Sequence, residues 1–300
     1  MRAPALSSGY EDRQGIRLDF EVYGLILQLA FFAQCRIATM CAAQAAISVF
    51  GGITMGNIYR SDLDQGILMH DCISFDLMDT LIMRRVPTAA DVFAIVEQRV
   101  SPKLSLPFAE YRIRSEKEWT SRGLAPTLEN IYSTLSQLAR LNEMETKLLM
   151  DEEWKTEQEV LTVRRDMIEV LRTVRESGKT ATILADSPWS GIQIRDLLQQ
   201  MGVQIYTMIL SAADVGQNRA NGLYAHYRAV CGEDKRFMHI GDNALKDGEL
   251  ARANGLDSLI IPRALDQYKR DNSGVQIPQD LSSRRILGEK IARQYNSPFA

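Results

Sequence analysis

Acidic side chains stand directly after three short apolar segments of this 300-residue sequence. They are Asp76, Asp186 and Asp242, and Asp247 follows five positions after the last of them. Carboxylates that lie close together repel each other, so a cluster of them indicates a bound cation or a functional site. A hard cation such as Mg²⁺, held by one or two carboxylates and by the phosphate oxygens of a substrate, would satisfy such a group. The spacing predicts this chemistry if the three segments lie side by side.

The apolar segments have the length and the β-branched or aromatic content of buried strands. Five strands are predicted: Cys72–Phe75, Thr180–Ala185, Ile205–Leu210, Arg236–Ile240 and Ser258–Ile261. An apolar stripe over Met167–Val174 and a helix start at Ser187-Pro188 predict helices between the later strands. This alternation predicts an α/β fold, a Rossmann-like parallel sheet covered on both faces. Ligands bind beyond the carboxyl ends of such strands, so we expect Asp76, Asp186 and Asp242 at one edge of the sheet.

The long segment between the first and second strands contains no convincing strand. Thr88 with Asp91, and Thr127 with Asn130, have the spacing of helix starts. Leu148–Val163 has the pattern of one or two charged amphipathic helices. We therefore predict an all-helical insertion, residues 87–165, that covers the acidic edge of a core made of residues 69–86 and 166–263. Residues 264–300 have the composition of a polar tail with one short helix.

The first 68 residues are predicted to form a helical extension. Residues 37–59 carry no charge, but polar residues and a Gly51-Gly52 pair dilute the run of about 20 apolar residues that a membrane span needs. The acidic residues before this run do not match a signal peptide. Helices packed on the body are favoured over a membrane anchor, and contact with a membrane stays an alternative for this extension. Met55 and Met69 would also serve as starts of the chain.

Composition narrows the class of protein further. The chain is 45% apolar and 24% charged, with a formal net charge of −3, as in folded globular proteins. It has no long run of one charge sign, so no nucleic-acid partner is expected. The four cysteines form no CxxC pair, which favours free thiols in a cytoplasmic protein over a disulfide framework or a zinc site. Nothing in the sequence indicates an oligomeric state.

Four motifs, in this order, resemble those of the haloacid-dehalogenase-like (HAD) hydrolase superfamily. They are Ile73-Ser-Phe-Asp-Leu-Met-Asp-Thr-Leu-Ile82, the strand end Leu184-Ala-Asp186, the surroundings of Arg219, and His239-Ile-Gly-Asp-Asn-Ala-Leu-Lys-Asp247. Together with Arg112-Ile-x-x-Glu116 in the insertion, these motifs are similar to those of a bacterial branch linked to cell-surface polysaccharide genes. The resemblance covers Asp71–Pro262. It implies the HAD core, with the helical insertion as a cap over the active site.

The resemblance also implies a role for each motif residue. Asp76 matches the nucleophile that forms an aspartyl-phosphate. Asp242 matches the acid that binds Mg²⁺, Asp247 matches its supporting acid, and Met78 matches a position whose backbone carbonyl binds the metal. Arg219 matches the basic catalytic residue of the third motif. The implied substrate-binding residues are Asp186, Ser187 and Thr80, of which Thr80 mainly supports the turn after the first strand.

The chain departs from the family pattern at three of these positions. Met78 stands where phosphatases have an aspartate that acts as general acid and base. Ala185 replaces a hydroxyl residue that contacts the phosphoryl group, and Arg219 replaces the usual lysine. Asp79 and Asp186 are the alternative proton donors.

Two main functions remain open after these departures. The first is a Mg²⁺-dependent phosphohydrolase that acts on a small phosphate ester, such as a sugar phosphate. The second is a catalytically weak or inactive module that binds a phosphorylated ligand in a surface-polysaccharide pathway. A dehalogenase, which attacks carbon, is less favoured because Asp242 and Asp247 are retained.

Overall fold

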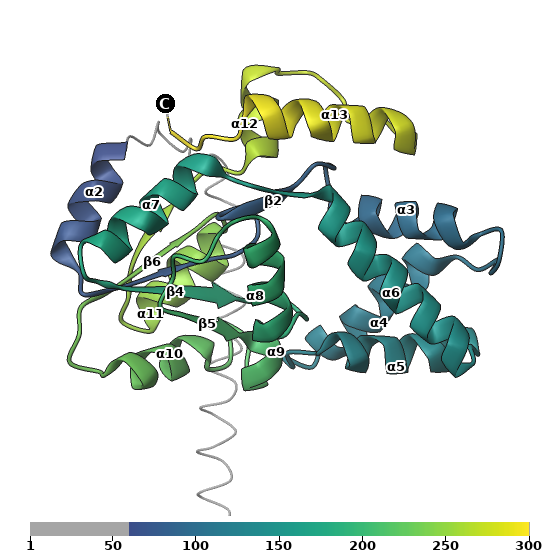
Figure 1. Cartoon of the computed structure of the whole chain (residues 1–300), viewed down its shortest axis with the longest axis horizontal. Coiled ribbons are helices and arrows are strands. Elements are labelled where there is room, and N and C mark those ends of the chain that lie inside the picture. The colour runs from purple at the N-terminus through teal and green to yellow at the C-terminus, as the bar shows by residue number, and fades with distance from the viewer. Residues whose placement is uncertain (1–59, 300) are drawn as a thin grey trace, which may run out of the picture. The chain divides into compact units, whose positions relative to one another are not determined.

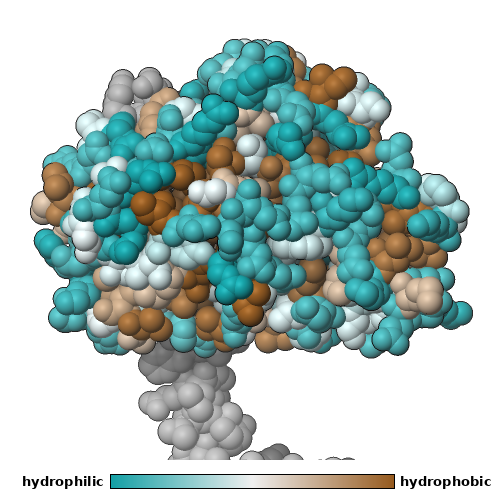
Figure 2. Space-filling model, viewed as in Figure 1, coloured by the Kyte–Doolittle hydropathy of each residue, from teal (hydrophilic) through white to brown (hydrophobic). Residues whose placement is uncertain are grey.

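The structure is a computed structural model that describes residues 60–299 (Figure 1). Its first described helix is α2 (Arg60–Met69), so most of the predicted N-terminal extension, residues 1–59, lies outside the described residues. The face drawn in Figure 2 is mainly hydrophilic, with hydrophobic side chains set among polar ones. Within residues 60–299, no helix combines the length and the apolar character that crossing a bilayer requires.

A five-stranded parallel sheet forms the centre of the described chain. In spatial order its strands are β5 (Met208–Ser211), β4 (Thr180–Ala185), β1 (Cys72–Phe75), β6 (Phe237–Gly241) and β7 (Asp257–Ile260). Every neighbouring pair is parallel, which confirms the predicted fold class. Phe75 at the end of β1 pairs with Ile183 on β4 and with Ile240 on β6. These three central strands therefore end at the same edge.

Alternate side chains of each strand point to opposite faces of the sheet. On β4, Ala181, Ile183 and Ala185 join the larger apolar cluster, which includes residues of α7 (Arg165–Glu176) and α8 (Gly191–Gln200). Leu184 joins the second cluster, which includes residues of α10 (Leu223–Cys231) and α11 (Leu250–Ala253). Helices thus cover both faces. The helix predicted from Ser187-Pro188 begins three residues later, where Ser190 is its N-cap.

The insertion after β1 contains four helices, which Figure 1 shows grouped beside the sheet. They are α3 (Ala89–Val100), α4 (Phe108–Thr120), α5 (Leu128–Ala139) and α6 (Glu143–Val160). Both predicted helix starts are confirmed. The Asp91 carboxylate accepts from the backbone N–H of Thr88 at 2.8 Å, and Thr127 and Asn130 form a reciprocal capping box. Below, these four helices are called the cap.

The expectation that the insertion is wholly helical was wrong at its exit. The chain returns to the core through a strand, β3 (Leu161–Val163), that pairs antiparallel with β2 (Ile82–Arg84). The two strands are the outgoing and returning connections of the cap. Three residues are too few to show a period-2 pattern, and their partner is far away along the chain, so local periodicity carries no signal for this pairing.

The C-terminal segment is more than a polar tail with one short helix. It forms α12 (Ala264–Asp271) and α13 (Leu281–Gln294), and α13 packs against α3 and β2. Gly288 on α13 approaches the segment between β2 and α3 so closely that a β-carbon there would collide with the backbone of Arg85 and Val86. The exposed polar face of α13 dominates its composition, which is why the sequence was interpreted as a solvated tail.

Candidate active site

Asp76 directly follows β1, and Asp242 directly follows the neighbouring strand β6. The backbone N–H of Asp76 donates to the Ile240 carbonyl at 2.8 Å, which fixes the two strand ends to each other. Carboxylate oxygens of Asp76, Asp242 and Asp247 all lie within 4.8 Å of one another. Asp186, which follows β4, lines the cavity that Asp76 and Asp242 face. The prediction that these acids meet at one edge of the sheet is confirmed.

Arg219 reaches the acids from the loop between α9 (Ala212–Val215) and α10. Its guanidinium is ion-paired with Asp76 Oδ1 and Asp247 Oδ1, and it donates to the Leu184 carbonyl at 2.7 Å. Arg219 is only 3% exposed. Burial opposes its charge, but Asp76 and Asp247 outweigh burial and raise its pKa, so it stays protonated. The planar fork of an arginine can bridge two carboxylates in a way that a lysine ammonium cannot.

Asp247 lies at the bottom of the cluster and is fully enclosed. Oδ1 accepts from Arg219 and, at 3.2 Å, from Nε2 of His239, while Oδ2 accepts from the backbone N–H groups of Asp242 and Asn243 at 3.0 and 2.9 Å. Burial opposes its ionisation, but the hydrogen bond from His239 and the charge of Arg219 lower its pKa to about 2. Four bonds use the accepting capacity of one carboxylate. Asp247 therefore acts by holding the loop and Arg219 in place.

Asp76 and Asp242 are much less well compensated. Burial raises the pKa of Asp76 to about 6; the Asp247 charge adds to this effect and Arg219 opposes it. Burial, together with the charges of Asp76, Asp79 and Asp247, raises the pKa of Asp242 to about 9, against the charge of Arg263. The ion-pair partner of Asp242 is Arg263, whose Nε lies 3.5 Å from Oδ2, which is too long for a good hydrogen bond. The surroundings of Asp76 and Asp242 therefore contain too little positive charge to offset both carboxylates.

Two further ion pairs stand around the acids. Arg263 donates from Nη2 to Asp79 Oδ2 at 2.8 Å, and Lys246 donates from Nζ to Asp186 Oδ2 at 3.0 Å. Asp79 adopts a left-handed conformation with φ 56°, which turns the chain sharply after β1. The two acids that the sequence offered as proton donors, Asp79 and Asp186, are therefore each paired with a cation.

The acids open onto two adjoining cavities of about 160 and 290 Å³. Four residues line both: Asp186, Ser187, Arg219 and Lys246. Asp76, Met78 and Asp242 line the smaller cavity. The larger one is walled on its far side by Glu116 and Thr120 of α4 and by the loop that follows, 124–126. The cap thus covers the acidic edge of the sheet, as predicted.

The remaining predicted residues divide into those that reach the cavities and those that do not. Met78 and Ser187 line the smaller cavity. Thr80 is fully buried and lines neither cavity, and its hydroxyl has no hydrogen-bond partner among the described residues. Ala185 is also fully buried, within the apolar cluster on the α7 and α8 face. Among these four residues, the hydroxyl that lines the cavities belongs to Ser187.

Lys246 and Arg263 are the cavity-lining cations that the sequence interpretation missed. Lys246 lies on a π-helical turn, η1 (Ala244–Glu249), between the two acids of the fourth motif. Arg263 follows the last strand at the same carboxyl end as Asp76 and Asp242. A search for charged residues after every strand, rather than for acids alone, would have found Arg263.

Counting formal charges tests whether this site suits a divalent cation. Five carboxylates (Asp76, Asp79, Asp186, Asp242 and Asp247) face three cations (Arg219, Lys246 and Arg263), which leaves a formal charge of −2. The deficit lies at Asp76 and Asp242, whose oxygens are close enough to share one ion. Mg²⁺ binds through one or two protein carboxylates together with water and substrate oxygens. The residues present therefore fit a magnesium ion held by Asp76 and Asp242.

Comparison with known proteins finds similarity in structure only. No protein-family model matches the sequence, and no curated protein matches it. An L-2-haloacid dehalogenase from Xanthobacter autotrophicus is 16% identical over 73% of this chain and 88% of its own, with a TM-score of 0.49. A predicted phosphatase from Clostridium acetobutylicum is 12% identical over 75% and 99%, with a TM-score of 0.39.

A HAD family enzyme from Bacteroides thetaiotaomicron, in complex with magnesium and inorganic phosphate, is 10% identical over 65% of this chain and 95% of its own, with a TM-score of 0.45. All three structures are below 20% identity and below a TM-score of 0.5.

Proposed function

We propose that the chain is a Mg²⁺-dependent phosphohydrolase of the HAD superfamily, with Asp76 as its nucleophile and a small phosphate ester as its substrate. The observation that supports this most strongly is the environment of the Asp76 carboxylate. Its carboxylate is buried at a strand end, faces a cavity, is held through Oδ1 by Arg219, and shares a deficit of positive charge with Asp242. Such an arrangement stabilises the arrival of a cation and a phosphoryl group together.

The chemistry would proceed in two displacements at phosphorus. Oδ2 of Asp76 forms a bond to phosphorus, and the bond from phosphorus to the leaving oxygen breaks, with its electron pair staying on that oxygen. Arg219 and Lys246 line the cavity where the non-bridging oxygens would lie. Water then attacks phosphorus and releases phosphate and the Asp76 carboxylate. Magnesium bound by Asp76 and Asp242 would neutralise charge on the phosphoryl group.

With Asp76 acting as the nucleophile and Asp242 holding the magnesium ion, the other positions of this cavity offer the leaving oxygen no free carboxylic acid as a proton donor. Met78 carries a thioether, Asp79 is paired with Arg263, and Asp186 is paired with Lys246. A substrate whose leaving group departs without being protonated should therefore react fastest. The motifs resemble those of the branch linked to surface polysaccharides, and this resemblance favours a sugar phosphate as the natural substrate.

The second candidate function is a module that binds a phosphorylated ligand without hydrolysing it. Two observations favour it: Met78 supplies no general acid or base, and the buried side chain of Ala185 supplies no hydroxyl to the phosphoryl group. The same cavity and cations would bind the ligand, but Asp76 would form no covalent bond.

A phosphatase assay on the full chain distinguishes the two functions. We expect hydrolysis of p-nitrophenyl phosphate, a substrate with a good leaving group, that requires Mg²⁺. Asp76→Asn should abolish it, because an amide is a poor nucleophile. Asp242→Asn should raise the Mg²⁺ concentration needed for half-maximal activity. Mass spectrometry of the wild type after mixing should detect a phosphoryl group on Asp76, since Met78 leaves breakdown slow.

The matched control is Asp71→Asn, which changes a carboxylate next to the opposite end of β1 and should leave activity unchanged. Binding of inorganic phosphate and Mg²⁺ without turnover or a covalent intermediate would favour the binding module. If neither Mg²⁺ nor phosphate binds, both functions are wrong.

A further inference from the structure

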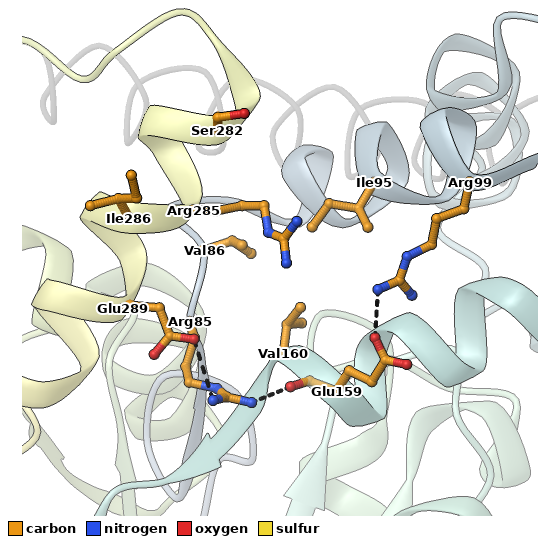
Figure 3. Close-up of a pocket in the computed structure, with 10 residues that line it drawn as sticks. All are labelled: Arg85, Val86, Ile95, Arg99, Glu159, Val160, Ser282, Arg285, Ile286 and Glu289. Carbon is orange, nitrogen blue, oxygen red and sulfur yellow. Dashed lines mark hydrogen bonds and ion pairs between the residues drawn. The ribbon is translucent and has the colours of Figure 1, made fainter. Parts of the chain in front are cut away.

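A cavity of about 460 Å³ lies away from the acids, between the cap, the segment that joins β2 to α3, and α13 (Figure 3). One wall is the outgoing connection of the cap, Arg85 and Val86 between β2 and α3. A second wall is the cap itself, with Ile95 and Arg99 of α3 and with Glu159 and Val160 at the end of α6, directly before β3. The third wall is α13. Sites for small molecules are commonly about 300–1,000 Å³ in volume, so this cavity has the size of a binding site.

The charged residues that line this cavity are paired, with one exception. Arg99 donates to Glu159 at 2.6 Å and to Glu152 at 3.1 Å, and Arg85 is ion-paired with Glu289 at 3.3 Å. Arg285 has no hydrogen bond or ion pair with any of the residues 60–299. Figure 3 shows its guanidinium projecting into the cavity between Val86, Ile95 and Val160. The cavity therefore presents one uncompensated positive charge.

The other surfaces of the cavity are apolar or incompletely paired. Val86, Ile95 and Val160 surround the Arg285 guanidinium, and Ile286 beside it is 72% exposed. Nε of Arg85 is buried and has no partner among the described residues. A ligand that suits these walls carries one planar negative group for the Arg285 fork and an apolar body for the valines and isoleucines.

Contacts from the C-terminal segment hold the cap at the start of α3 and at its returning connection, β3. Arg284 on α13 is ion-paired with Asp91 at the start of α3. Farther along the chain, Asn296 donates from Nδ2 to the Val163 carbonyl at 2.9 Å and accepts from the Arg165 N–H at 2.8 Å. A ligand between α13, the outgoing connection and the end of α6 would brace the cap against this segment.

We propose that this cavity binds an organic carboxylate with an apolar body, and that the bound ligand restrains movement of the cap. The carboxylate pairs with Arg285, and the apolar body packs on Ile286 and Val160, with the nearly buried Val86 and Ile95 beneath it. The site is separate from the cavity at Asp76 and does not depend on the activity proposed for it.

Titration of the full chain with octanoate tests the proposal, with 1-octanol as the uncharged ligand of equal chain length. We expect saturable binding of octanoate at one site and much weaker binding of octanol. Arg285→Gln should weaken octanoate binding about tenfold or more, because a charge-assisted hydrogen bond is lost. Ile286→Asp should also weaken it. Arg293→Gln removes another exposed arginine of α13 that does not line the cavity, and binding should not change.

Hydrogen exchange gives a second readout that locates the ligand. With octanoate bound, amide exchange should slow in residues 84–88 and 159–165 of the wild type, and the slowing should be absent in Arg285→Gln. Equal binding of octanol and octanoate, or unchanged binding by Arg285→Gln, would overturn the proposal. So would protection that appears only around Asp76 and Asp242.

Discussion

Two buried arginines of this protein, one in the cap and one at the end of the sheet, have opposite surroundings. Arg112 on α4 is 2% exposed and donates to Glu153 at 2.8 Å and to Glu116 at 2.7 Å, with its guanidinium 4.7 Å from the Phe93 ring centre. Glu153 also accepts from the Tyr132 hydroxyl at 2.7 Å. In this group, the cap cluster, burial raises the pKa of Glu153, but Arg112 and the Tyr132 hydroxyl oppose this effect and hydrogen-bond to its carboxylate, so its hydrogen bonds are satisfied inside the protein.

The cluster around Arg219 is not matched in this way. Arg219 is bound by two acids, but burial, together with the charges of Asp76, Asp79 and Asp247, leaves Asp242 with a strongly raised pKa. Asp76, Asp242 and Arg219 line the cavity at the edge of the sheet, whereas in the cap cluster Arg112 and Glu153 line neither of the two cavities and only Glu116 borders the larger one. A matched buried ion pair stabilises or specifies a fold at best. A buried group of charges that is short of positive charge destabilises the folded state. A site that retains such a group is a candidate for binding a cation.

Replacing either arginine is expected to have the largest effects on stability and activity, and the two replacements should distinguish the clusters. Arg112→Met and Arg219→Met each leave a buried carboxylate unpaired, so each should lower the free energy of unfolding by about 3–5 kcal/mol. Only Arg219→Met should also abolish phosphatase activity per folded molecule. Urea unfolding and the p-nitrophenyl phosphate assay measure the two quantities.

Arg195→Met, on the exposed face of α8, is the control for loss of an arginine. The distinction between the clusters fails if folded Arg219→Met keeps its turnover. Arg219→Lys keeps the charge without the fork, and serves if the methionine variant does not fold.

Supplying the missing proton donor should have the next largest effect. Met78→Asp places a carboxyl group on the cavity wall, and we expect turnover of alkyl phosphates to rise by up to about 10²–10⁴-fold, the usual contribution of a general acid-base group. Aryl phosphates with good leaving groups should gain much less. Plotting rate against leaving-group pKa for both proteins measures the change. Met78→Asn, of similar size but without a titratable proton, should give no gain, and an equal gain from it would contradict the explanation.

A smaller effect is expected at Lys246. Lys246→Met removes a cation that lines both cavities, and the KM for a phosphate ester should rise about tenfold, since hydrogen bonds to charged groups contribute about 1.5–3 kcal/mol. The fall in kcat should be less. Steady-state kinetics separate the two constants. Lys269→Met, on α12 away from both cavities, is the control, and a variant of Lys246 with unchanged KM would remove this residue from the binding set.

The smallest effect concerns Asp71, next to the end of β1 that lies opposite Asp76. Hydrogen bonds from Arg236 lower the pKa of this exposed carboxyl below its ordinary value of 3.8, whereas burial raises that of Asp76. The stabilising contribution of Asp71 is therefore present above pH 3.8 and is lost as the pH falls towards its lower folded-state pKa. Carbon NMR of the carboxyl group should show the lowered pKa. Arg236→Gln should return it to near 3.8, and an unshifted wild-type value would contradict this account.

Much of the fold was predictable because its signals are local. Short apolar runs identified the strands, and Thr88 and Thr127 marked helix starts through side chains that bond only three residues away. Parallel strands end at a common edge, so the proximity of the acids after β1, β4 and β6 could be predicted from the sequence. The pairing of β2 with β3 and the docking of α13 had no comparable signal, because each depends on a partner that lies elsewhere in the chain.

The sequence by itself determined which residue types stand at the ends of the strands, and thereby the kind of chemistry that the edge of the sheet could support. Only the tertiary structure decided how these charges are shared. Arg219 is 143 positions from Asp76, and Arg263 is 184 positions from Asp79, yet each pair is in contact. Whether a carboxylate is matched, as Asp247 is, or left short of positive charge, as Asp242 is, depends on distance and burial in three dimensions, and no spacing along the chain records either quantity.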